Sequence, residues 1–141
     1  MNTLKIPIEV IQPSTGMAQA VLTELAEHLD LLAKTGKTHV IDLNSLPMNI
    51  TDKQELQHFL GQGEVNITLI TIGDSKIFET AYSGIWWIKH YSADEKFISE
   101  FLEVTSIPEI IKSHVGDIQQ AANELKSVIN HDEERMYHER R

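Results

Sequence analysis

Five carboxylates are candidates for acid–base chemistry: Asp42, Glu64, Glu79, Glu100 and Glu103. Two carboxyl groups that face one another could move a proton to and from a small substrate. All but Asp42 lie on or beside a predicted antiparallel sheet, where charged side chains on an open, solvated face are the ordinary interpretation. Glu79 differs, because Phe78 and nearby aromatic residues would partly remove it from water.

Metal coordination receives little support from the sequence. The absence of cysteine excludes disulfides, thiolate zinc sites, cysteine-ligated iron–sulfur clusters and a cysteine nucleophile. No two of the seven histidines are three or four residues apart, the spacing that would place both on one face of a helix. Histidines without a ligand role are the favoured interpretation, so we predict no metal, no cofactor and no catalytic residue.

Gly61 and Gly63 could suggest a phosphate-binding loop. Such loops run from a strand through glycines into a helix, because the helix N-terminus supplies free N–H groups and the positive end of the dipole. Here the predicted order is helix, glycines, strand. A helix that ends at glycine and leads into a strand is therefore the favoured interpretation.

The composition predicts one acidic, soluble domain. The chain has 141 residues, enough for a real hydrophobic core. Its 21 Asp and Glu against 12 Lys and Arg give a formal net charge of −9, which disfavours nucleic acid and anionic lipid and favours basic partners. We find neither a secretion signal nor a segment apolar enough to cross a bilayer. A cytoplasmic protein without membrane insertion is expected.

The stretch that positions these side chains is residues 60–108, bounded by glycine and proline. Its strands are predicted at residues 65–72, 76–82, 85–91 and 97–105. Apolar and polar residues alternate in the first strand and slip at Leu69 and Ile70, which predicts a bulge or a strand end covered on both faces. Connections this short require antiparallel neighbours, so the centre is predicted to be a meander.

Amphipathic helices are predicted before the sheet. The first ends at Gly36, and a short buried strand follows over residues 37–43. The second begins at Thr51, with Gln54 completing a capping box, and ends at Gly61. Residues 6–11 alternate enough to form a strand or an extended arm.

Two helical segments are predicted after the sheet. The first starts with Ile107 and Pro108 and is interrupted at Gly116, and the second restarts at Asp117. The charged residues 131–141 are predicted to be a frayed helix end or a mobile tail. The whole chain, residues 1–141, is thus predicted to be one domain with its core in residues 17–130.

Trp86 and Trp87 belong to the most informative apolar group, with Tyr82, Tyr91 and Met48. Adjacent residues of a strand point to opposite faces, so one tryptophan should point inward and the other outward. An outward tryptophan is either covered by a helix or a dimer mate, or available to a partner, since tryptophan is enriched in interface hot spots.

Four ordered blocks of sequence resemble the conserved C-terminal region of the HupH/HyaF hydrogenase expression/formation proteins. They are LNSLPM from Leu43, LGQGEV from Leu60, ETAYSGIWW from Glu79 and EVTSIP from Glu103. The resemblance covers residues 42–108, about half of the chain. Its motif positions are Gly61, Gly63, Glu64, Glu79, Thr80, Gly84, Trp86, Ile107 and Pro108.

This resemblance implies an accessory protein in the maturation of uptake nickel–iron hydrogenases, which assists the iron–sulfur small subunit before export and is not an enzyme. The strong acidity suits a basic client, such as a twin-arginine export signal. An antiparallel sheet also offers an edge for strand addition. Family members are longer, with a further related region, and a homodimer could replace that region here.

We therefore predict an α+β domain with an antiparallel meander of four to five strands and helices packed mainly on one face. The predicted function is a non-catalytic assembly chaperone that binds a hydrogenase small-subunit precursor. Its predicted protein-binding residues are Glu64, Glu79, Tyr82, Trp86, Trp87 and Glu103. Two alternatives stay open: a small-molecule-binding domain or enzyme that uses the sheet carboxylates, and an oligomerisation module.

Overall fold

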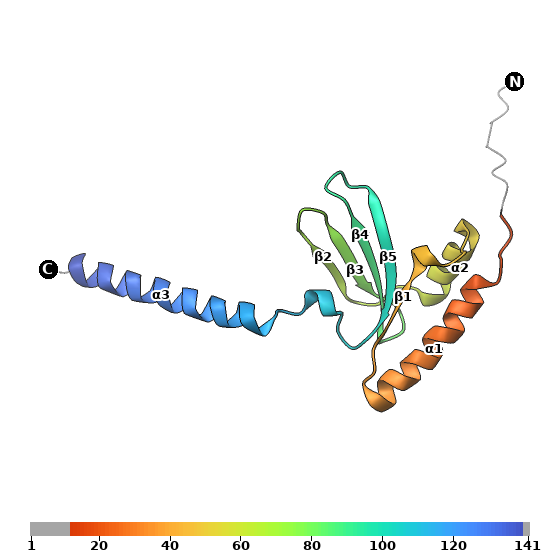
Figure 1. Ribbon diagram of the computed structural model, residues 1–141, viewed down its shortest axis with the longest axis horizontal. Coiled ribbons are helices and arrows are strands. Elements are labelled where there is room, and N and C mark those ends of the chain that lie inside the picture. Colours follow the sequence, from red (N-terminus) through yellow and green to blue (C-terminus); the bar gives the residue numbers. More distant parts are fainter. Residues whose placement is uncertain (1–11, 140–141) are drawn as a thin grey trace, which may run out of the picture. The chain divides into compact units, whose positions relative to one another are not determined.

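The computed structural model describes residues 12–139, which divide into two compact units at Pro108 (Figure 1). In the first unit, helix α1 (Met17–Thr35) and helix α2 (Ile50–Leu60) accompany a five-stranded sheet. Its strands are β1 (His39–Asp42), β2 (Asn66–Leu69), β3 (Ser75–Glu79), β4 (Ile85–Tyr91) and β5 (Phe97–Val104). The predicted arm at residues 6–11 lies outside the described residues.

The sheet is antiparallel throughout, in the order β1-β5-β4-β3-β2. Strands β2 to β5 form the predicted meander. The loops that join them are too short to cross over to a parallel neighbour. Strand β1 pairs with β5 at the far edge. Neither the bulge nor the covered strand end predicted at Leu69 and Ile70 is present: β2 ends at Leu69, and Ile70 is 84% exposed. The register shift lies at His90 and Tyr91 of β4.

Helices α1 and α2 cover one face of the sheet, here called the helix face (Figure 1). A continuous core joins Val21 and Leu25 of α1, Leu56 of α2, and Trp87 and Leu102 of the sheet. Each of these five side chains is buried. The arrangement confirms the predicted α+β class with helices mainly on one face.

The opposite face of the sheet also buries apolar side chains. Ile77, Trp86 and Ile88 lie there by register, and all three are buried. The indole N–H of Trp86 donates to the carbonyl of Thr105, 3.1 Å away. The two tryptophans therefore point to opposite faces, as predicted, but neither is open to solvent, with exposed fractions of 7% for Trp86 and 1% for Trp87.

The cap of α2 lies two residues before the predicted one. Asn49 is the N-cap, and its side chain accepts from the backbone N–H of Asp52, whose carboxylate accepts in return from the N–H of Asn49. Thr51 instead donates to the carbonyl of Gln12. Asn49 with Asp52 and Thr51 with Gln54 both have the spacing of a capping box, so spacing alone does not decide which residue is the N-cap.

Asp52 also connects α2 to the residues that precede α1. It is completely buried and accepts from the N–H of Thr15 at 2.8 Å and from its hydroxyl at 2.6 Å. Burial raises the pKa of Asp52, but hydrogen bonds from Thr15, Asn49 and Ser14 lower it, and the net pKa lies below the ordinary value of 3.8. A carboxylate that is more acidic in the folded state stabilises that state when it is ionised.

We expect Asp52→Asn to destabilise the protein at pH 7 and to matter progressively less in acid. The contribution of Asp52 is complete above its unfolded-state pKa and is lost as the pH falls through the lower folded-state pKa. Urea unfolding of wild type and variant between pH 7 and pH 2 measures the difference. Asp30→Asn, on the exposed surface of α1, is the control. A difference that stays constant over this pH range would contradict the assignment.

The second unit contains a short 3-10 helix, η2 (Glu109–Ile111), and one long helix, α3 (Val115–Glu139). The predicted interruption at Gly116 is wrong, since this glycine lies in the first turn of α3, where the backbone N–H groups have no helical partner in any case. The helix also continues past Asn130 through the residues predicted as a frayed end or tail, and Arg135 pairs with Glu139 one turn away.

Within residues 12–139, none of the helices combines the length and the apolar character that a membrane crossing requires.

Candidate partner-binding surface

Three of the predicted site residues form one row across the sheet. Glu79 of β3 lies opposite Trp86 of β4, and Trp86 lies opposite Glu103 of β5. Directly opposed residues of neighbouring strands have Cβ atoms about 5 Å apart, so the row is continuous. It lies on the face away from the helices, with both carboxylates half-buried at the two sides of a buried tryptophan.

Trp87 lies on the helix face and is part of the core. Its ring stacks on Phe78 with a centroid distance of 6.1 Å, and its indole N–H donates to Oε1 of Glu100. Glu100 is 1% exposed and forms ion pairs with Lys53 of α2 and Lys89 of β4. This carboxylate, a sequence candidate for acid–base work, therefore binds α2 to the sheet.

An apolar groove of about 320 Å³ opens where α1, α2 and the β3–β4 turn meet. Phe59 and Tyr82 are its two aromatic residues, with exposed fractions of 55% and 53%. Leu22 and Leu29 of α1 and Ile85 of β4 also line it. The groove thus combines accessible aromatic rings with a rigid helical wall, which is how apolar peptide segments are commonly bound.

The β3–β4 turn contributes Tyr82 to the groove and joins the strands that carry Glu79 and Trp86, whose side chains lie on the opposite face of the sheet. The turn follows Glu79 and precedes Ile85, and Tyr82 stands at its exposed tip. Gly84 has φ 95°, and a Cβ at this position would lie 3.0 Å from Leu29, so α1 packs closely on the turn. Glycine is required here by backbone conformation and by space.

Glu64 joins the same end of the sheet through the segment between α2 and β2. The N–H of Gly63 donates to the carbonyl of Glu79, and the N–H of Ala81 donates to the carbonyl of Leu60. A Cβ on Gly63 would lie 2.5 Å from the carbonyl oxygen of Thr80, so this segment lies directly against the turn. Glu64 itself is exposed. We call Phe59, Glu64, Glu79, Tyr82 and Glu103 the turn surface.

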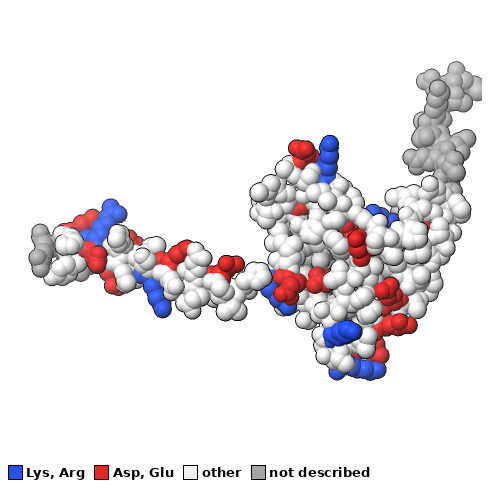
Figure 2. All heavy atoms as spheres, viewed as in Figure 1, with Lys and Arg blue, Asp and Glu red and all other residues white. Residues whose placement is uncertain are grey.

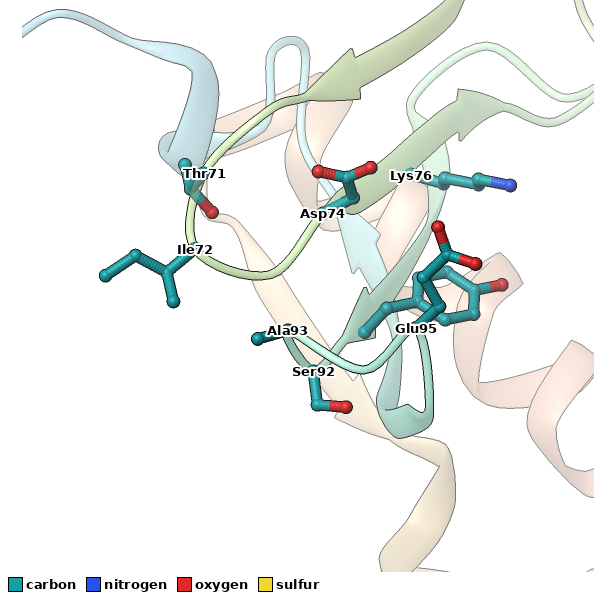
Figure 3. Close-up of a pocket in the computed structure, with 8 residues that line it drawn as sticks. Thr71, Ile72, Asp74, Lys76, Ser92, Ala93 and Glu95 are labelled. Atoms are coloured by element: carbon teal, nitrogen blue, oxygen red, sulfur yellow. The ribbon is translucent and has the colours of Figure 1, made fainter.

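A different pocket, of about 400 Å³, lies at the opposite ends of the strands, between the tips of the β2–β3 and β4–β5 hairpins (Figure 3). Asp74, Lys76 and Glu95 lie on one side of it and Ile72 on the other. Ile72 is 92% exposed. The carboxylates in this pocket are not those that the sequence suggested for acid–base work, and Glu64, Glu79 and Glu103 do not line it.

Acidic side chains are spread over the visible face of residues 12–108 rather than gathered into one patch (Figure 2). Asp42 is one of the exposed ones, and its carboxylate accepts from the N–H of Asn44. The visible distribution indicates a general negative field.

Sequence reasoning missed two features of this region. Phe59 lies on the apolar side of α2, and helical periodicity cannot tell a covered residue from one in the wall of an open groove. Lys53, the partner of Glu100, lies 47 positions away in the sequence, and no local pattern links a helix residue to a particular strand residue. The available signal for this ion pair was the position of Lys53 near the start of a predicted amphipathic helix.

Comparisons with known proteins agree with this architecture. Residues 16–131 match the family model described as the HupH hydrogenase expression protein, C-terminal conserved region. A solved structure, the hydrogenase expression protein HupH from Thiobacillus denitrificans ATCC 25259, superposes with a TM-score of 0.79 at 39% identity, over 84% of this chain and 98% of that one.

Curated relatives are longer proteins. The hydrogenase expression/formation protein HupQ of Azotobacter chroococcum mcd 1 is 33% identical over 79% of this chain and 40% of its own length. The hydrogenase-1 operon protein HyaF of Escherichia coli K12 is 28% identical over 64% of this chain and 32% of its own length. The chain thus spans about 40% or less of these two relatives. By its family match and its fold, it belongs to the family of HupH hydrogenase expression proteins, through their conserved C-terminal region.

Proposed function

We propose that this protein is a non-catalytic, cytoplasmic accessory protein in the maturation of an uptake nickel–iron hydrogenase, where it binds the precursor of the iron–sulfur small subunit. Family membership supports the hydrogenase context. The observation that carries the binding role is the open apolar groove with two accessible aromatic rings, Phe59 and Tyr82.

The groove supplies the apolar part of the proposed contact. Exposed aromatic rings in a preformed concave site can bury large area on binding while losing little conformational freedom, which is why they are frequent in hot spots. The helix side is built on α1, whose Val21 and Leu25 are fixed in the core. A wall held in this way does not have to become ordered when a partner binds.

Negative charge supplies the second part of the proposed contact with the precursor. The formal net charge of −9 favours association with a basic segment. Glu64, Glu79 and Glu103 lie at the end of the sheet that carries the β3–β4 turn, with Glu79 and Glu103 on the face opposite the groove. Electrostatic complementarity of this kind raises association rates and selects partners more than it adds affinity. A precursor with a basic signal and apolar flanking residues fits both parts of the turn surface.

Trp86 and Trp87 contribute to the proposed surface mainly through its shape. Both are buried in the domain, so a partner can reach only a small part of either ring. Glu79 and Glu103 are positioned beside Trp86, because Trp86 pairs with both carboxylate-bearing residues across the sheet.

We expect Tyr82→Ala, alone or with Phe59→Ala, to weaken capture of the small-subunit precursor by about thirtyfold or more, the effect of losing a hot-spot residue. Both side chains are more than half exposed, so the fold should remain intact. Affinity is measured with the purified full chain and an immobilised small-subunit precursor that retains its signal.

The matched control is Ile72→Ala, which removes an apolar side chain of 92% exposure at the other end of the strands. This variant should bind the precursor like wild type. Unchanged capture by the Tyr82→Ala, Phe59→Ala double variant would remove the groove from the proposal. Failure of wild type to bind the precursor, with normal hydrogenase maturation after deletion, would overturn the proposed function itself.

A further inference from the structure

Glu24, His28 and His39 come together on the surface of the first unit. Glu24 and His28 lie one turn apart on α1, and His39 is the first residue of β1. Oε1 of Glu24 is 3.0 Å from Nε2 of His39 and 4.0 Å from Nε2 of His28. One ligand-type atom from each residue lies within 4.8 Å of the others.

The two imidazole rings are stacked, with centroids 3.5 Å apart and planes 5° from parallel. A neutral imidazole keeps a nitrogen lone pair for a metal ion. The side chains of His28 and His39 are 21% and 30% exposed, so an ion can reach them while their packing limits their movement.

The backbone that carries these residues is well defined. Helix α1 ends at Gly36, whose N–H donates to the carbonyl of Leu32 and whose φ of 75° turns the chain out of the helix. Three residues later, β1 begins with His39, which pairs with Val104 of β5. The two histidines are thus held by a helix and a strand, and sites on such elements are more precise than sites on loops.

We propose that Glu24, His28 and His39 form a binding site for a divalent late transition-metal ion, with Zn²⁺ as its best probe. Two imidazoles and one carboxylate are a common set of protein ligands for zinc, with a fourth position left for water or another ligand. Ligand atoms of tetrahedral zinc lie about 3.3 Å apart, and the two stacked rings must turn from their parallel arrangement so that their in-plane lone pairs meet at one ion. Imidazole nitrogen disfavours Mg²⁺ and Ca²⁺, which prefer oxygen.

This site is independent of the proposed hydrogenase role. It shares helix α1 with the groove, but none of Glu24, His28 and His39 lines the groove. Sequence spacing could not predict it, since the two histidines are eleven residues apart and belong to different elements.

The test is calorimetric titration of Zn²⁺ into the untagged full chain at pH 7.5, with Mg²⁺ as the comparison ion. We expect saturable binding of one Zn²⁺ per chain, no binding of Mg²⁺, and at least about tenfold weaker binding for His28→Gln and for His39→Gln. His58→Gln, which changes an exposed histidine of α2, is the matched control and should bind like wild type.

A second readout separates a ligand role from a structural one. Zn²⁺ should shift the imidazole resonances of His28 and His39 before those of the other histidines, and should raise the unfolding temperature of wild type and of His58→Gln. If His39→Gln is unfolded without metal, Glu24→Gln replaces it, because this side chain is 45% exposed. Absence of a one-to-one isotherm, or equal loss of affinity in His58→Gln, would overturn the site.

Discussion

Replacing Trp87 by alanine should lower the free energy of unfolding by about 3–5 kcal/mol, the range for large aromatic side chains removed from a core. Trp87 is 1% exposed and packs in the cluster that joins α1, α2 and the sheet. The truncation would leave a cavity and remove the stacking with Phe78. It would also leave Glu100 without the indole donor. Urea unfolding followed by circular dichroism measures the change.

Trp87→Phe is the control for this prediction. It keeps most of the buried volume and the contact with Phe78 and removes the hydrogen bond, so we expect a smaller loss of stability than for alanine. A loss below about 1 kcal/mol for Trp87→Ala would show that the core does not depend on this ring. Reduced partner binding by Trp87→Ala would report loss of folded protein, which makes Tyr82→Ala the better probe of the surface.

Replacing Glu100 by alanine should also destabilise the domain strongly, by about 3 kcal/mol or more, the lower end of the range for a broken buried ion pair. The change removes the common partner of Lys53, Lys89 and the Trp87 indole. Because the two lysine side chains are 30% and 25% exposed, water can solvate their charges, which limits the effect. The indole N–H has no such access, since Trp87 is buried.

Two further variants, Glu100→Gln and Glu109→Ala, separate the contribution of the ion pairs to this loss of stability from that of the hydrogen bond. Glutamine keeps an acceptor for Trp87 and removes the charge, so its loss of stability should be the part that belongs to the ion pairs. Glu109, with a side chain 74% exposed, pairs with Lys112 on the surface, and its removal should change stability by less than about 1 kcal/mol. Equal effects of Glu100→Ala and Glu109→Ala would contradict the structural role of the buried carboxylate.

The element types and the antiparallel meander could be predicted from residue order alone. Alternation of apolar and polar residues, helical spacing and glycine or proline at the boundaries are local features, and they act within a few residues. The loops between residues 66 and 104 are too short for a parallel crossover, so topology followed from length. The family resemblance rested on the same stretch, residues 42–108.

Details that depend on competing local choices were not predictable in this way. Asn49 and Thr51 both have a suitable partner three residues later, and Asn49 is used because Asp52 is also held by Thr15, far away in the sequence. Gly116 is predicted to interrupt a helix, and the charged residues after Asn130 are predicted to be a frayed helix end or a mobile tail, yet α3 includes Gly116 and continues to Glu139. Helix propensity is a weak signal that neighbouring residues can override.

The amino-acid sequence by itself determined the fold class, the order of strands β2 to β5 and the acidic character of this protein, because these depend on periodicity, loop length and composition. Only the tertiary structure decided that both tryptophans are buried, that Phe59 and Tyr82 share an open groove, and that His28 meets His39. Each of these depends on which face of one element packs against which face of another. That choice is made by contacts between residues distant in the chain, which a local pattern does not contain.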